Sequence, residues 1–236
     1  MRYFRSLWRK IKRLFSHKDS SRPADPIVEH PVDPIVPIEE GEIDTVDNGS
    51  WKEPDWTYLF DNATLDENRI DEIKHVCDKI YKNKERYEKV AKDVNPKMPW
   101  WFVAVLHYRE SSLSFAGVLH NGDRIIGTGR KTYHVPKGRG PFDTWEEAAV
   151  DALQGFAHHK DWDVYNCLKK AERFNGLGYR RRGVGEYSPY VWAGTSIHDE
   201  TGKYVADGRY SNTAVEKQLG VAAIIIGLRD YYAVKM

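Results

Sequence analysis

PWWFVAVLHYRES, residues 99–111, is the stretch that decides the fold. After the opening proline come seven consecutive apolar residues, and the polar residues gather at the far end, around Glu110. A proline suits the first turn of a helix, and a helix that is apolar on all sides is expected to be buried. We therefore expect a core helix over about residues 99–112 that ends with Glu110 where the chain enters a loop.

A carboxylic acid in that place is held by apolar walls and can still reach a cleft. Burial raises the pKa of a carboxyl group, because the charged form loses its hydration. A glutamic acid that keeps its proton near neutral pH can give that proton to a leaving oxygen, which is the central need of glycoside cleavage. Glu110 is thus the candidate general acid. The alternative is a solvated residue at the end of a helix.

Further helices are predicted around this segment. Apolar residues at helical spacing indicate helices over residues 66–93, 144–158, 163–174 and 213–228. Thr144 and Glu147 form a capping box, and Asp143 and Glu146 suit the same helix start. Residues 116–141 are rich in Gly and Thr, which favours a loop or a short hairpin. The fold class is therefore mainly α, with one small β-hairpin or loop excursion.

The first 50 residues differ from this body. Residues 1–18 contain seven Lys or Arg and no acid, and apolar residues recur at three- and four-residue steps over residues 2–17. This pattern predicts a basic amphipathic helix that lies on an anionic membrane surface. Docking on another protein and a disordered basic tail are the alternatives. The segment has neither the apolar core of a signal peptide nor the length of a membrane span.

Residues 19–50 are predicted to be an acidic linker. Five prolines and a repeated DPIV favour an extended chain without a core. The folded domain is expected over residues 51–236, where basic and acidic residues nearly balance, which argues against a nucleic-acid partner. The cysteines Cys77 and Cys167 lie on apolar helix faces and predict two buried thiols. The adjacent pair His158-His159 is a poor zinc clamp, so neither a metal nor another cofactor is expected.

Several motifs together resemble the lysozyme-like superfamily. Glu110-Ser111 at a helix end is followed by the turn AERFNGLGY at 171–179, similar to goose-type lysozymes and soluble lytic transglycosylases. Five further motifs resemble a phage- or prophage-associated endolysin branch of this superfamily. They are HNGD at 120–123, YHVP at 133–136, FDTWEE at 142–147, SPYVWAGT at 188–195 and KYVADG at 203–208. The resemblance covers about residues 95–230, and the order of the motifs is more specific than any single one.

The resemblance implies a peptidoglycan hydrolase, a muramidase that cleaves the MurNAc–GlcNAc β-1,4 bond with Glu110 as acid. It also implies Asp123 as second carboxylate, since an Asp at about this place helps to position water in goose-type lysozymes. A solvated turn is the alternative for Asp123. A phage lysin without an export signal would be made in the bacterial cytoplasm, act on the wall in the periplasm, and need a partner that opens the membrane.

The sequence departs from the family at two points. Phe174 stands where transglycosylases usually have Tyr, and their Gly-Leu-Met-Gln-like segment is absent. Lytic transglycosylation with the same acid, a catalytically silent glycan-binding module of an envelope or virion, and a chitin-type substrate therefore stay open as alternatives.

The remaining candidates each have a structural alternative. His107 shares a helix face with Glu110 and could tune its pKa or bind sugar, or simply be a core histidine. Ser111 could line the cleft or cap the helix. Asn175 could bind an N-acetyl amide or end a helix. The aromatic candidates are Tyr179, Tyr190 and Trp192, whose flat rings could stack on sugar faces or pack in the core. The run Arg180-Arg181-Arg182 could bind the carboxylates of peptidoglycan's peptide stems or be a solvated turn.

Overall fold

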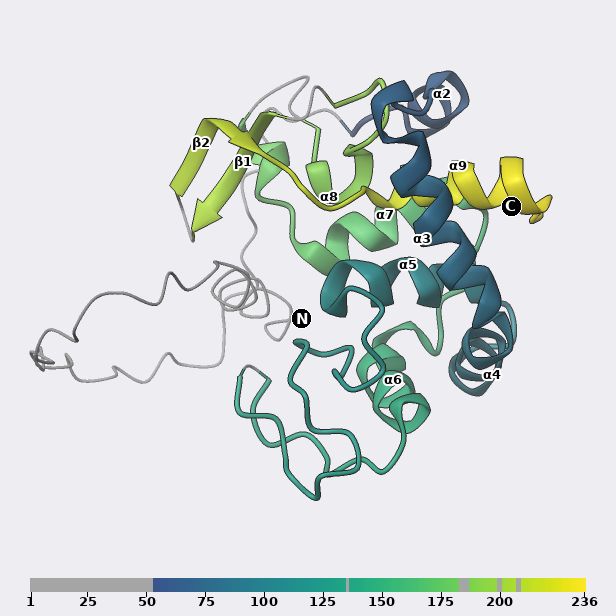
Figure 1. Ribbon diagram of the computed structural model, residues 1–236, viewed down its shortest axis with the longest axis vertical. Coiled ribbons are helices and arrows are strands. Elements are labelled where there is room, and N and C mark those ends of the chain that lie inside the picture. The colour runs from purple at the N-terminus through teal and green to yellow at the C-terminus, as the bar shows by residue number, and fades with distance from the viewer. Residues whose placement is uncertain (1–52, 135, 183–186, 199–200, 207–208) are drawn as a thin grey trace, which may run out of the picture.

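The computed structural model describes residues 53–134, 136–182, 187–198, 201–206 and 209–236. The predicted amphipathic helix of residues 1–18 and the linker of residues 19–50 lie outside the described residues. Figure 1 shows the helical body that these residues form. Its α-helices are α2 (Trp56–Asn62), α3 (Ile70–Lys82), α4 (Lys84–Val94), α5 (Trp100–Ser111), α6 (Trp145–Leu153), α7 (Val164–Asn175), α8 (Pro189–Trp192) and α9 (Val221–Tyr232).

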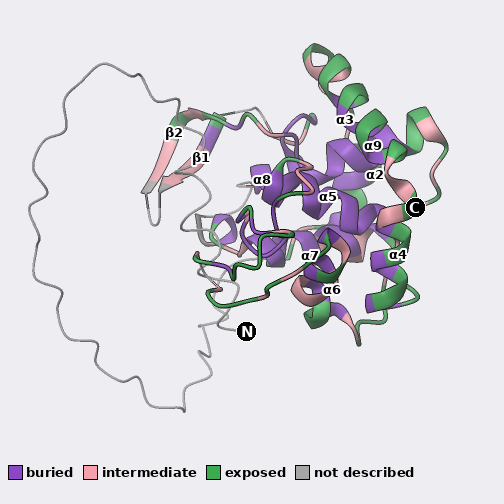
Figure 2. Cartoon of the chain, turned by 60° about the horizontal axis from the view of Figure 1, so that its bottom comes forward, coloured by how far each residue is buried: buried purple, intermediate pink, exposed green. Residues whose placement is uncertain are grey.

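The helix α5 lies in the middle of the body (Figure 1), and it packs against α4 and α9. Every residue from Trp101 to Ser111 is buried, and Figure 2 shows α5 in the buried colour along its length. A helix with apolar residues on every side can be stable only when other elements cover all of its sides, and here they do. The prediction of a buried core helix is confirmed.

The small β element is a hairpin of β1 (Thr201–Ala206) and β2 (Arg209–Val215). The strands are antiparallel, with Lys203 opposite Ser211 and Tyr204 opposite Tyr210. They stand at one edge of the body in Figure 1. The predicted fold class, mainly helical with one small β-hairpin or loop excursion, is thus confirmed, although a hairpin was not predicted at β1 and β2.

Residues 116–141 form a loop, so the hairpin alternative for this segment is wrong. Glycines with positive φ turn the chain repeatedly, at Gly122, Gly127, Gly129 and Gly138. The backbone N–H groups of Tyr133 and His134 donate to the carboxylate of Asp123. In a hairpin, the carbonyl groups of a neighbouring strand would accept these bonds. The loop is therefore held by side-chain contacts as well as by backbone bonds such as that from the Thr132 N–H to the Arg139 carbonyl, at 2.9 Å.

Two helix boundaries differ from the prediction. The segment 66–93 is broken at Asn83, whose side-chain amide donates to the carbonyl of Lys79 at 2.8 Å, so α3 and α4 are separate helices. The last helix does not start near residue 213, because residues 209–215 pair as β2. Its apolar run begins at Val221, and it ends at Tyr232, four residues later than predicted.

The predicted capping box and the two predicted buried thiols are confirmed. Thr144 and Glu147 form the reciprocal capping box at the start of α6, which a 3₁₀ turn at Gln154–Phe156 extends. Cys77 and Cys167 are buried free thiols. In the part of the chain that the structure describes, no helix is both long and apolar enough to span a bilayer.

The start of α9 touches the end of α8 at Gly220. The Gly220 N–H donates to the carbonyl of Ala193 at 2.7 Å, and a Cβ atom at Gly220 would lie 2.6 Å from the Ala193 nitrogen. Since the neighbouring atoms are backbone, they cannot move aside as a flexible side chain would. This contact fixes α8 against α9.

We predict that Gly220→Ala lowers the free energy of unfolding by about 2 kcal/mol or more, because the methyl group forces two backbone segments apart. Gly178→Ala is the matched control, since its Cβ would meet only the ring of Tyr204 at an ordinary 3.6 Å. Urea unfolding of both variants measures the difference. Equal stabilities would show that the α8–α9 contact is loose.

Candidate active site

Glu110 lies in the last turn of α5, and only 8% of its surface is exposed. Burial raises the pKa of its carboxyl group from the usual 4.5 to about 7, because the charged form is stripped of water. The phenol of Tyr190 donates a hydrogen bond to Glu110 Oε1 at 2.9 Å and lowers this pKa in part. The carboxyl group is therefore both protonated near neutral pH and held in one orientation.

Arg109 stands beside this pair. Its guanidinium carbon lies 4.5 Å from the centroid of the Tyr190 ring, and its Nη1 donates to the carbonyl of Leu219 at 2.9 Å. The positive charge lowers the pKa of Glu110, opposing the larger effect of burial. Two buried polar atoms of these segments, Arg109 Nε and Ser188 Oγ, have no hydrogen-bond partner in the structure.

The chain just before α9 closes around the end of α5. The Leu219 N–H donates to the Tyr108 hydroxyl at 3.1 Å, and the Gln218 side-chain amide lies 3.4 Å from the Tyr108 carbonyl. The site is thus assembled from α5, α8 and the segment between β2 and α9. These elements are far apart in sequence, and Gly220 lets the last two meet.

Asp123 is not placed as a free second carboxylate. It is 1% exposed, its Oδ2 accepts the N–H groups of Tyr133 and His134, and its Oδ1 bonds His134 Nδ1 at 2.5 Å. Both oxygens are therefore engaged in holding the loop. The solvated-turn alternative is wrong as well, because the side chain is buried.

His107 and Ser111 serve the structure of the core. His107 is fully buried beside Trp145, its Nδ1 lies 3.0 Å from the Tyr87 hydroxyl, and burial lowers the pKa of the imidazole to about 4. Ser111 Oγ donates to the His107 carbonyl at 3.2 Å. These contacts agree with the core and capping alternatives, and they leave no sugar contact to His107.

The structure places the remaining predicted binding residues in different surroundings. Asn175 is the last residue of α7, is 8% exposed, and precedes Gly176, whose φ of 104° ends the helix. The Tyr179 hydroxyl accepts the Tyr204 N–H of the hairpin at 3.2 Å, and Trp192 stacks on Trp56 in the core. Tyr190 is thus the one aromatic candidate placed against Glu110.

Arg180 is not part of a solvated basic turn. It is 7% exposed and forms ion pairs with the buried Glu172, at 2.5 Å, and with Glu53. Burial raises the pKa of Glu172, and Arg180 opposes that rise. The arginine therefore ties α7 to the start of the described chain. The side chains of Arg181 and Arg182 lie outside the described residues.

Sequence reasoning missed the residues that surround Glu110 and the end of α5. Arg109 and Gln218 carry no motif, and Tyr190 was expected to stack on sugar, not to bond the acid. The order Arg109-Glu110 was the one available signal, since neighbouring charges tune one another. Leu219 acts through its backbone, which sequence patterns do not reveal.

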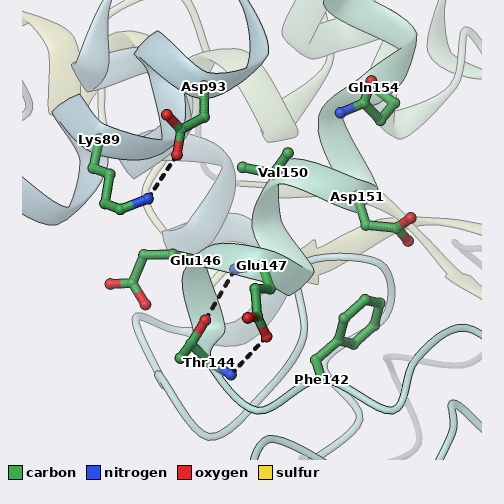
Figure 3. Close-up of a pocket in the computed structure, with 9 residues that line it drawn as sticks. All are labelled: Lys89, Asp93, Phe142, Thr144, Glu146, Glu147, Val150, Asp151 and Gln154. Carbon is green, nitrogen blue, oxygen red and sulfur yellow. Dashed lines mark hydrogen bonds and ion pairs between the residues drawn. The ribbon is translucent and has the colours of Figure 1, made fainter.

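A shallow hollow of about 790 Å³ lies between α4 and α6 (Figure 3). It contains none of the predicted site residues. Its carboxylates already have partners: Asp93 binds Lys89, Glu146 binds Arg86, Glu147 accepts backbone N–H groups at the capping box, and Asp151 binds His120 and Arg139. The perturbed acid at the end of α5 is therefore the better candidate for chemistry.

Comparison with known protein families, curated proteins and solved structures finds no match for this chain. Among the described residues, no three His, Cys, Asp or Glu side chains come together in a way that could hold a metal ion. The assignment of function therefore depends on the geometry around Glu110 and on the sequence motifs.

Glu110→Gln is predicted to stabilise the protein above neutral pH. The folded state keeps the Glu110 proton up to about pH 7, whereas the unfolded chain loses it near pH 4.5. The wild type thus loses up to about 3 kcal/mol of stability as pH rises through this window, and the glutamine variant does not. Urea unfolding at pH 4 and pH 8 measures it. A difference between variant and wild type that is the same at both pH values would contradict the raised pKa.

Proposed function

We propose that this protein is a peptidoglycan hydrolase that cleaves the MurNAc–GlcNAc β-1,4 bond with Glu110 as general acid. The observation that supports this most is the buried carboxyl group of Glu110, with its pKa raised to about 7 and its position fixed by Tyr190. The motif order that resembles lysozyme-like proteins gives the substrate class. Bacterial peptidoglycan is the partner that follows from it.

The chemistry needs a proton at the leaving oxygen. When the C1–O bond of the glycoside breaks, the leaving sugar must take up a proton, and Glu110 can donate it. At pH 7 about half of the Glu110 side chains hold their proton, compared with under about 1% for a glutamate of ordinary pKa. The raised pKa therefore makes the acid available at physiological pH.

Lytic transglycosylation is the second candidate, and one observation favours it. A second carboxylate close to Glu110 would raise the pKa of Glu110 further. In the described chain, only burial, Tyr190 and Arg109 shift this pKa, so no second carboxylate acts on it. Asp123 is committed to the loop. Positive charge on the sugar would then be met by the substrate's own N-acetyl group, and either water or an internal hydroxyl completes the reaction.

The setting proposed for this activity is phage lysis or wall degradation. The protein would be made in the bacterial cytoplasm and reach the wall through a membrane opened by a partner. The basic residues 1–18 would hold it at an anionic membrane surface. A catalytically silent glycan-binding module is the alternative of another class, and it would not need the raised pKa of Glu110.

Glu110→Gln should abolish product formation from purified peptidoglycan, a loss of at least about 1000-fold, because glutamine has no proton to give. Mass spectrometry of the digest distinguishes reducing-end muropeptides, made by hydrolysis, from anhydro-muropeptides, made by transglycosylation. Glu67→Gln, in a short exposed helix far along the chain from the site, is the control. An active Glu110→Gln enzyme would refute the assignment, and an inactive wild type would favour the binding module.

Tyr190→Phe should move the alkaline limb of the pH profile of kcat/KM upward by roughly half a unit to one unit. The phenol lowers the pKa of Glu110 by bonding the charged carboxylate, so its removal lets the pKa rise further. Tyr179→Phe is the matched control, since its hydroxyl bonds the hairpin and not Glu110. An unshifted limb in Tyr190→Phe would mean that another group titrates there.

A further inference from the structure

The loop after α5 presents one aromatic ring to solvent. Tyr133 is 55% exposed, and its ring packs against the imidazole of His134 with centroids 4.5 Å apart. The His134 side chain is itself partly exposed. An exposed ring beside an imidazole offers both a flat apolar face and a polar group, and neither is needed by the core.

Hydrogen bonds hold the backbone of both residues and the imidazole of His134 in place. The buried Asp123 accepts the Tyr133 N–H at 2.9 Å, the His134 N–H at 3.0 Å and the His134 Nδ1–H at 2.5 Å. Asn121 adds a bond from its side-chain amide to the His134 carbonyl at 3.1 Å. Since Nδ1 donates to Asp123, the second ring nitrogen, Nε2, is left as the one that can bind a ligand.

The same loop touches the end of α5. Gly122, the residue before Asp123, approaches the Glu110 carbonyl so closely that a Cβ atom there would lie 3.2 Å from the oxygen. A Cβ atom at Gly117 would lie 3.5 Å from the Cβ of Ser111. The part of the loop that leads into Asp123 thus lies against the helix end that carries the acid, and Asp123 joins this part to Tyr133 and His134.

We propose that Tyr133 and His134 form a glycan-binding subsite adjacent to Glu110, which takes a β-1,4-linked amino-sugar strand. This inference rests on the proposed function and adds the surface that holds its substrate. The apolar C–H face of a pyranose stacks on the Tyr133 ring, and a hydroxyl or N-acetyl amide of the sugar donates to His134 Nε2. Asp123 is then a positioning residue, which fixes the imidazole and takes no part in the chemistry.

The burial of Asp123 supports this division of roles. A carboxylate that activates water needs an open oxygen, whereas one that orients a histidine is expected to be covered and fully bonded. Asp123 is of the second kind.

The test uses the full chain carrying Glu110→Gln, so that substrate binds without being cleaved. Isothermal titration measures its affinity for peptidoglycan glycan strands stripped of their peptides. In this background Tyr133→Ala should weaken binding about 10-fold, and His134→Gln about 3- to 10-fold. Tyr58→Ala removes another exposed tyrosine, from α2, and His120→Gln breaks the pair that His120 of the same loop forms with Asp151 of α6; both should keep the parent affinity.

The outcomes separate this inference from the proposed function. Unchanged affinity in Tyr133→Ala, in a protein whose wild type cleaves peptidoglycan, overturns the subsite alone. An equal loss in His120→Gln also overturns it, because the effect then comes from the loop as a whole. If the wild type cleaves nothing and the parent binds no glycan, the proposed function fails together with the subsite. Unfolding midpoints of all variants show whether each one is folded.

Discussion

Burial of α5 on all sides is the constraint on which the other features depend. The helix carries seven apolar residues in succession, and it can be stable only inside a shell of other helices. That shell is supplied by α4 and α9, together with Tyr190 of α8 and the segment that leads into α9. Because the shell extends to the last turn, it also encloses Glu110, whose carboxyl group would otherwise reach water.

The enclosure of Glu110 has an energetic cost that the protein offsets only in part. A buried carboxyl group favours its neutral form, and Tyr190 and Arg109 stabilise the charged form without restoring the ordinary pKa. The resulting balance leaves the group near half-protonation at neutral pH. A buried carboxyl group of this kind lowers the stability of the fold above neutral pH. Strongly perturbed carboxyl groups are therefore candidates for a functional role.

Local sequence patterns predicted most of the helices. Features that depend on contacts between residues far apart in the sequence were not predicted. The run 99–111 and the Thr144–Glu147 capping box indicated their helices because the signals are local. The hairpin of β1 and β2 was missed, since its second strand was taken for the start of the last helix. Its pairing depends on partners across the turn. The break at Asn83 depends on one side-chain bond to the preceding turn.

The candidate site shows the same division. Glu110 was found because a carboxylic acid at the end of an apolar run is conspicuous in the sequence. The role of Asp123 was not predictable, because its bonds go to the backbone and side chain of residues ten and eleven positions later. Arg180 was expected in solvent, and its ion pair with Glu172 depends on how α7 packs. Side chains whose partners come from folding give no local signal.

The titration of the Glu110 carboxyl group tests the central claim most directly. Carboxyl ¹³C shifts of glutamate-labelled protein, followed from pH 4 to pH 9 and assigned by comparison with Glu110→Gln, give the pKa of this one residue. A midpoint near 7 is the predicted result. A midpoint between 4 and 5 would mean that water reaches the carboxyl group, and it would contradict the proposed role of Glu110 as a general acid.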